Sequence, residues 1–197
     1  AQSLSNIKLS YNKLTELPTS FGRLTQIINI DLDGNKFATF PECLIQLSEL
    51  QGINISSNVL TVLPENIDKY SKLERLYVCY NRLTALPQDM SALKKLSSLD
   101  AEHNKIEQFS TKLDWDNISI LLLGHNRISH IEDIAVRAAK LSQFSLAHNR
   151  LRELPKNFVF SNMSKLDVSH NQLETIPENW TSSSYMWLFN AAYNRLR

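Results

Sequence analysis

The sequence predicts an α/β fold of stacked repeats, with a parallel β-sheet along one face and mostly loops or 3₁₀ turns on the other. An asparagine recurs every 22 or 23 residues, apolar residues stand at fixed distances from it, and all six prolines lie six residues after one of these asparagines. A period of this length across nearly the whole chain indicates a solenoid, in which each unit buries its apolar side against its neighbours. The repeat asparagines are Asn12, Asn35, Asn58, Asn81, Asn104, Asn126, Asn149, Asn171 and Asn194.

The residues before each asparagine predict a short strand. In the second unit the apolar positions are Ile27, Ile30, Leu32, Phe37 and Phe40. The alternation of apolar and polar residues ahead of the asparagine is typical of a strand with one buried face. The asparagine amide can both donate and accept, so we expect it to satisfy backbone groups that the following turn buries.

The outer return path begins near the prolines, because proline fixes φ and cannot donate to a strand ladder. The six prolines are Pro18, Pro41, Pro64, Pro87, Pro155 and Pro177. Nine residues after most asparagines a bulky apolar residue is expected to fill the outer side of the core. These residues are Phe21, Leu44, Ile67, Met90, Leu113, Phe158 and Trp180.

The fifth and sixth units lack the proline, so the second half should be less regular on its outer face. Residues 131–141 combine good helix formers with an apolar spacing near 3.6, which predicts a helical turn or two.

The clearest unit, residues 73–87, reads LxxLxLxxNxLxxLP and resembles the leucine-rich repeat family of the 23-residue type. This resemblance covers all nine units. It implies a curved, horseshoe-shaped solenoid with the parallel sheet on its concave face. It also implies a protein-binding role, as an intracellular scaffold or as a targeting region beside a phosphatase, kinase or cyclase domain.

The composition disfavours several other classes of function. The formal net charge is +1 and the charged residues are 21% of the chain, with both signs interspersed. Nothing therefore indicates nucleic acid or membrane insertion as a partner. No glycine-rich phosphate loop, nucleophile elbow or metal-ligand cluster is present, so we expect no catalytic residues, no cofactor and no metal.

Outward positions of the predicted strands supply the candidate binding site for a protein partner of unknown identity. An acidic rim surrounds an arginine and a tyrosine, which are frequent at interface hot spots, and an apolar step lies beside them. The alternative is that these are ordinary solvent-facing positions. The candidate residues are Asp31, Asp33, Asn54, Arg75, Tyr77, Asp100, Glu102, Ile120 and Leu122.

Residues of one chemical type also recur directly before and directly after the repeat asparagines. Histidine precedes four consecutive ones, at His103, His125, His148 and His170. A metal ladder is one interpretation, but strands about 4.8 Å apart do not easily converge several imidazoles on one ion, so a family feature is favoured. A basic residue follows seven asparagines, which could form a ridge for acidic partners or again reflect the family. The basic residues are Lys13, Lys36, Arg82, Lys105, Arg127, Arg150 and Arg195.

We expect one monomeric domain over residues 1–197, as a fragment of a longer protein. The two cysteines, Cys43 and Cys79, are badly placed to bridge, which favours the cytoplasm. Four Asn-x-Ser/Thr sequences, a number close to chance, leave an extracellular receptor or secreted pathogen protein open. They begin at Asn54, Asn117, Asn162 and Asn179.

Overall fold

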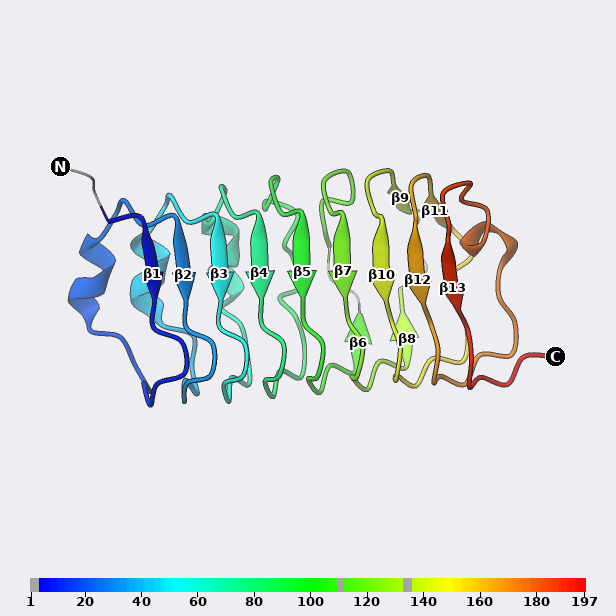
Figure 1. Cartoon of the computed structure of the whole chain (residues 1–197), viewed down its shortest axis with the longest axis horizontal. Helices are drawn as coiled ribbons and strands as arrows, with labels where there is room; N and C mark the ends of the chain where they lie inside the picture. Colours follow the sequence, from blue (N-terminus) through cyan, green and yellow to red (C-terminus); the bar gives the residue numbers. More distant parts are fainter. Residues whose placement is uncertain (1–3, 110–111, 133–135) are drawn as a thin grey trace.

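The computed structural model describes residues 4–109, 112–132 and 136–197, and it is dominated by one nine-stranded parallel sheet. The strands lie side by side along the long axis of the molecule (Figure 1). Each pairs with the next through equivalent residues, such as Asn6 with Asn29, so the repeat in the sequence is the register of the sheet. The strands are β1 (Asn6–Lys8), β2 (Asn29–Asp31), β3 (Gly52–Asn54), β4 (Arg75–Tyr77), β5 (Ser98–Asp100), β7 (Ile120–Leu122), β10 (Gln143–Ser145), β12 (Lys165–Asp167) and β13 (Leu188–Asn190).

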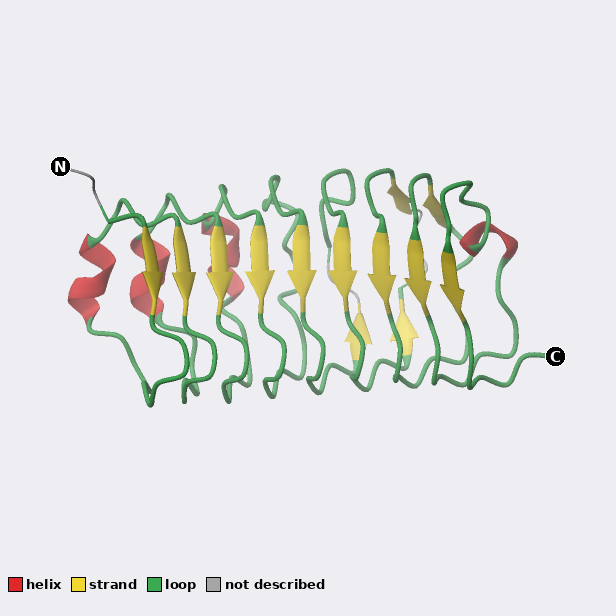
Figure 2. Ribbon diagram, in the orientation of Figure 1, coloured by secondary structure: helices red, strands yellow, loops and turns green. Residues whose placement is uncertain are grey.

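In the described residues the side opposite the sheet carries four short 3₁₀ helices, some seen behind the strands and some beyond the two ends of the sheet in Figure 2. They are η1 (Thr19–Arg23), η2 (Glu42–Gln46), η3 (Glu65–Lys69) and η4 (Glu178–Trp180). Each begins directly after a repeat proline, whose backbone has φ between −68° and −62°. The fixed φ of proline directs the chain out of the strand side and into the first helical turn. The predicted parallel sheet with a loop and 3₁₀ outer face is therefore confirmed.

The outer face of the second half is less regular, as predicted, because two small parallel sheets stand in place of 3₁₀ helices between residues 108 and 160, ahead of η4. In them β6 (Gln108–Phe109) pairs with β8 (His130–Ile131), and β9 (Val136–Ala138) pairs with β11 (Phe158–Phe160). The helical turn predicted within residues 131–141 is wrong wherever that stretch is described, and its residues 133–135 lie outside the described residues. Pairing with the neighbouring coil overrides helix propensity, since it satisfies backbone groups in two coils at once.

A single apolar core fills the space between the sheet and the outer face. The inward strand residues Ile53, Leu76 and Leu99 are at most 1% exposed. Most of the bulky residues predicted for the outer side are buried too: Leu44, Ile67, Met90, Leu113, Phe158 and Trp180. Trp180 stacks on Phe158 and donates through Nε1 to the Pro155 carbonyl at 2.7 Å. Stacking therefore gives each coil the burial that one unit alone could not achieve.

The repeat asparagines join successive coils, as expected from their amide chemistry. Asn81 Nδ2 lies 3.0 Å from the carbonyl oxygen of Ile55 in the preceding coil and 3.1 Å from that of Val78 in its own. Its Oδ1 accepts from the Leu60 amide at 3.0 Å. Every repeat asparagine from Asn35 to Asn194 accepts the equivalent bond. Backbone groups that the turns would bury without partners are thereby paired between coils.

Candidate functional site

The outward side of the nine-stranded sheet, here called the strand face, brings together the residues predicted for partner binding. Sheet pairing aligns Asp31, Asn54, Tyr77, Asp100 and Leu122 in one row across β2, β3, β4, β5 and β7. All five are half-buried, so their positions are restricted while one side stays accessible.

The other candidates lie beside this row. Arg75 and Ile120 stand at the start of their strands, one on each side of Ser98 in β5. Asp33 and Glu102 follow the ends of β2 and β5. The structure therefore places all nine candidate residues on or directly beside five neighbouring strands.

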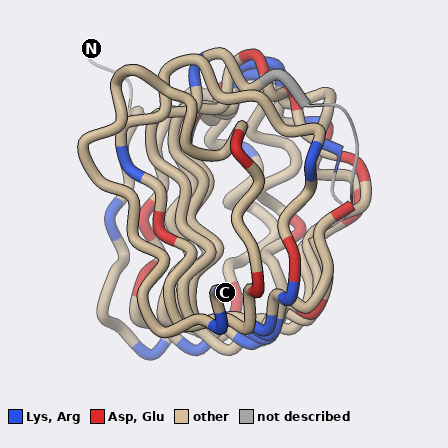
Figure 3. The backbone as a smooth tube through the Cα atoms, turned by 90° about the vertical axis from the view of Figure 1, so that its right-hand side faces the viewer, with Lys and Arg blue, Asp and Glu red and all other residues tan. Residues whose placement is uncertain are grey.

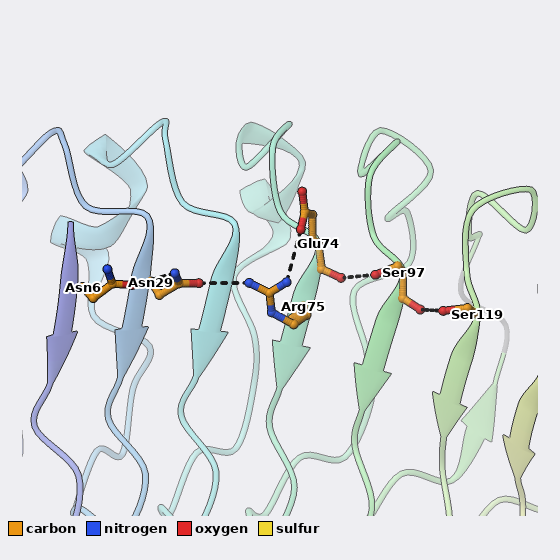
Figure 4. Close-up of polar contacts among 6 residues, drawn as sticks. All are labelled: Asn6, Asn29, Glu74, Arg75, Ser97 and Ser119. Carbon is orange, nitrogen blue, oxygen red and sulfur yellow. Dashed lines mark hydrogen bonds and ion pairs between the residues drawn. The ribbon is translucent and has the colours of Figure 1, made fainter.

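Arg75 is held in place by residues that the sequence did not indicate. Its Nη2 donates to Asn29 Oδ1 at 3.1 Å, and its Nη1 lies 3.2 Å from Glu74 Oε2. Asn29 in turn donates to Asn6 Oδ1 at 2.7 Å (Figure 4). The only indication of these contacts in the sequence was Gly52. A glycine at this position of β3 leaves room for side chains from β2 and β4 to meet across it.

The acidic candidates are held by turns and neighbours. Asp31 Oδ1 accepts from the Asp33 amide and from Asn54 Nδ2, both at 3.1 Å. Asp100 Oδ1 accepts from the Glu102 amide at 3.0 Å. Burial raises the pKa of Asp100 above its ordinary value. These carboxylates are thus fixed in position rather than free to rotate.

Cys79 lies near the acidic residues Asp33 and Asp100, and its thiol has low reactivity. Its Sγ donates to Ser56 Oγ at 3.2 Å. Burial raises the pKa of its thiol to about 11, which keeps it protonated at neutral pH. Both cysteines are free, in agreement with the prediction that they are badly placed to bridge.

A shallow cavity of about 170 Å³ opens on the strand face over β1 to β4. Its floor includes Ile30 and Ile53, while Asp31, Arg75 and Tyr77 stand around it. The cavity therefore combines an apolar floor with a cation, an anion and an aromatic ring. Asp100, Glu102, Ile120 and Leu122 stand outside it and extend the candidate surface toward β7.

The four column histidines form a stack with two tyrosines along the edge where the strands end. Successive ring planes lie within 16° of parallel. The nitrogen lone pairs lie in the ring planes, so those of neighbouring rings lie in nearly parallel planes about 4 Å apart and do not converge on one ion. The geometry therefore gives a physical reason against the metal-ladder interpretation.

Within the part of the chain that is described, no helix is long and apolar enough to cross a membrane.

Comparisons with known proteins agree with this geometry. A family model described as Leucine rich repeat matches residues 48–106, and a second one, with the description Leucine Rich Repeat, matches residues 3–24 and 162–183. A search of curated protein sequences gives no significant match.

Solved structures share the fold over nearly the whole chain. The plant peptide hormone receptor RGFR1 in complex with RGF2 is 26% identical, with a TM-score of 0.82 over 97% of this chain and 32% of its own. YopM from Yersinia enterocolitica is 26% identical, with a TM-score of 0.77 over 99% of this chain and 39% of its own.

The Arabidopsis receptor kinase HAESA, solved with the peptide hormone IDA and the co-receptor SERK1, is 23% identical. Its TM-score is 0.84 over 96% of this chain and 34% of its own, and it bears on the fold alone. The chain thus spans about a third of the length of these solved chains. The matched family models, the repeat asparagines and the parallel sheet show together that the chain belongs to the leucine-rich repeat family.

Proposed function

We propose that this chain is a protein-binding module whose strand face, from β2 to β7, receives a protein partner. The observation that carries the proposal is the arrangement of Arg75. Its guanidinium is held by Asn29 and Glu74 beside Tyr77, at the rim of an apolar-floored cavity. An arginine fixed before binding loses little conformational freedom on binding, which is a property of interface hot spots.

The charges around this site indicate the kind of partner. Asp31, Asp33, Asp100 and Glu102 lie on the same face, so the partner should carry a basic group near an apolar one. Ile120 and Leu122 are half-buried and offer apolar contact at the β7 end. RGFR1, one of the similar solved structures, is described as a peptide hormone receptor in complex with RGF2, which supports a protein or peptide ligand.

The test is a comparative pull-down with mass spectrometry. Tyr77→Ala combined with Asp100→Lys removes the ring and reverses one charge on the strand face. The matched control, Tyr185→Ala with Asp68→Lys, makes the same two changes at exposed positions away from this surface. Partners that the wild-type and control proteins retain, and the strand-face variant loses, are the expected result. Retention of every partner by the strand-face variant would contradict the proposal.

A second candidate is that the chain is the recognition region of a larger receptor or signalling enzyme. RGFR1 is described as a plant peptide hormone receptor, and this chain covers 32% of its solved chain. The full reading frame tests this idea directly. A kinase, phosphatase or cyclase domain in that frame is expected, and a frame without any such domain would exclude it.

We propose a cytoplasmic location. Both cysteines are free thiols, and each of the four sequon asparagines donates through Nδ2, the atom that carries an N-linked glycan. The Asn179 amide is the least available for glycosylation, because its Nδ2 donates to the carbonyls of both Lys156 and Phe158. Intact mass of the native protein should show no glycan, and a glycan on Asn54 or Asn117 would place the chain outside the cell.

A further inference from the structure

An unbroken stack of six rings runs along the edge where the strands turn. The stack consists of Tyr80, His103, His125, His148, His170 and Tyr193, here called the histidine stack. Neighbouring centroids are 3.9–4.2 Å apart and the planes differ by 9–16°. The six rings therefore form a strip about 20 Å long that follows the pitch of the coils.

The backbone imposes this arrangement. Every residue of the histidine stack precedes a repeat asparagine and has a positive φ between 52° and 56°. Identical backbone geometry in consecutive coils directs the rings the same way and brings them face to face. His125 and His148 are exposed, whereas His103 and His170 are half-buried. The middle of the stack is thus available to a partner.

A cavity of about 430 Å³ lies beside the histidine stack on the strand face, over β7 to β13. All four histidines line it, together with short side chains such as Ala147 and Ser169. Gly124, in the same column as Ala147, leaves room that Glu102 partly occupies, since a Cβ there would lie 2.6 Å from Glu102 Oε1. Small residues in this column keep the imidazole edges open.

The charges here depend on the histidines. The charged residues that line the cavity are Glu102, Lys165 and Asp167, which give a formal charge of −1 while the histidines are neutral. Protonation of two of the four would change this to +1. Asp100 also interacts electrostatically with His103. The surface therefore changes from weakly acidic to basic when the histidines take up protons.

A permanent basic ridge follows the same edge. Lys105, Arg127 and Arg150 each stand two residues after a stacked histidine, and all three are exposed. In the view along the molecule, Lys and Arg gather at the lower edge of the coil, where the strands turn (Figure 3). Cations on the ridge and cations on the histidines would attract the same anionic partner.

We propose that the histidine stack and the ridge residues Lys105, Arg127 and Arg150 bind an acidic peptide segment, and that protonation of the stack increases the affinity. Glu102 and Leu122 of the strand-face site also line this cavity, but the proposed binding groups, the stacked histidines and the ridge residues, do not belong to that site. It stands whether or not that site binds a partner.

The geometry favours an extended peptide. Such a chain advances about 3.3 Å per residue, so about six residues cover the strip. Alternate side chains point to the same side about 7 Å apart, and alternate imidazoles in the stack are about 8 Å apart, from the 4.0 and 4.1 Å steps between neighbours. Protons on alternate rings would also avoid direct repulsion between neighbours. The net charge of +1 and the acids Glu102 and Asp167 disfavour a nucleic acid, which needs many uncompensated cations.

The histidine pKa values support a coupling between proton uptake and peptide binding. Burial, followed by the charge of neighbouring histidines, lowers the pKa of His125 and of His148. A peptide carboxylate beside the rings would raise these histidine pKa values, so the protein should take up protons when the peptide binds.

The experiment uses a fluorescein-labelled hexa-aspartate peptide, with anisotropy measured at pH 7.5 and pH 5.5 at constant ionic strength. We expect about tenfold tighter binding at pH 5.5, the factor that two new exposed ion pairs provide. His125→Tyr with His148→Tyr removes the two exposed imidazoles and one member of each alternate pair, so it should reduce this gain. Tyrosine is the matched replacement because the fold already accepts it in this column, at positive φ and within the stack, in Tyr80 and Tyr193.

The controls separate the proposed site from general effects. His130→Tyr makes the same substitution in β8, outside the stack, and should keep the full gain. A hexa-asparagine peptide should not bind. Equal affinity of hexa-aspartate at both pH values, or an undiminished gain in the double variant, would overturn the proposal. An equal gain for a single-stranded oligothymidylate would overturn the assignment to acidic peptides.

Discussion

Arg75 reaches across an entire strand to contact Asn29, which lies 46 positions earlier in the chain, with Nη2 3.1 Å from Oδ1. The strand between them is β3, and the residue under the contact is Gly52. A Cβ on Gly52 would overlap Asn29 Oδ1 and lie 3.4 Å from Arg75 Nη2. The position of the guanidinium on the strand face therefore depends on the absence of one side chain.

Gly52→Ala should release Arg75 without unfolding the protein. The groups that the new methyl meets first are ends of polar side chains, which can move, so the free energy of unfolding should change by less than about 1 kcal/mol. In nitrogen–proton correlation spectra the Arg75 guanidinium signals should broaden or shift toward those of a mobile arginine. Asn29→Ala is the control and should produce the same change. Unaltered Arg75 signals in both variants would show that the contact does not hold the side chain.

Asn81→Ala should be strongly destabilising. It leaves the buried amide of Leu60 without its acceptor, and it removes one of the two asparagine donors from each of the carbonyls of Ile55 and Val78. The expected loss is about 3 kcal/mol, measured as a lower urea midpoint with an unchanged slope. Asn12→Ala is the matched control, since Asn12 is exposed and, among the described residues, its side chain bonds within its own coil. Its effect should stay below about 1 kcal/mol, and equal losses in the two variants would contradict a role in joining coils.

Acidification should lower stability through the histidine stack. The pKa values of His125 and His148 are depressed below the ordinary 6.5, first by burial and then by neighbouring charges. The unfolded chain therefore binds protons that the folded chain does not, so stability is undiminished above pH 6.5 and falls as the pH drops through that value.

Thermal unfolding at pH 7.5, 6.5 and 5.5 measures this effect without any ligand. His125→Tyr with His148→Tyr should make the melting temperature less dependent on pH, while His130→Tyr should leave the wild-type dependence intact. A wild-type profile that persists in the double variant would assign the effect to carboxylates instead.

Cys79 should react slowly with alkylating reagents. Burial raises its pKa from 9.0 to about 11, which lowers the thiolate fraction near pH 8 about a hundredfold. Iodoacetamide labelling of the Cys43→Ser variant, followed by mass spectrometry, should be about that much slower in buffer than in urea. Comparable rates in the two solutions would mean that Cys79 is not protected.

The sequence was sufficient for the features that depend on spacing. Strand positions, the register of the sheet and the buried asparagines all follow from one recurring residue, because each coil meets only its neighbours. The two 22-residue units did not disturb this, since β5 and β7 still pair residue for residue, as Ser98 with Ile120. The shorter units are therefore accommodated outside the strands.

Features that depend on particular side chains in other coils were not predictable in this way. The Arg75–Asn29 contact requires a glycine in the coil between them, which no periodic pattern specifies. The stretch around residues 131–141 has helical spacing, yet its described part forms strands because a neighbouring coil supplies a pairing edge. The histidine column was visible, but its face-to-face stacking required the positive φ that the sequence does not display.

The hydrogen bonds that the asparagines make from coil to coil also limit how such a molecule can grow. A duplicated unit of 22 or 23 residues would meet both of its neighbours with the same donors and acceptors, so the gene can lengthen by whole turns. An insertion of two or three residues beside Asn81 would instead separate the amide from Leu60. Tolerance to insertions should therefore be highest in the return loops and lowest beside the asparagines, and a library of random insertions would map it directly.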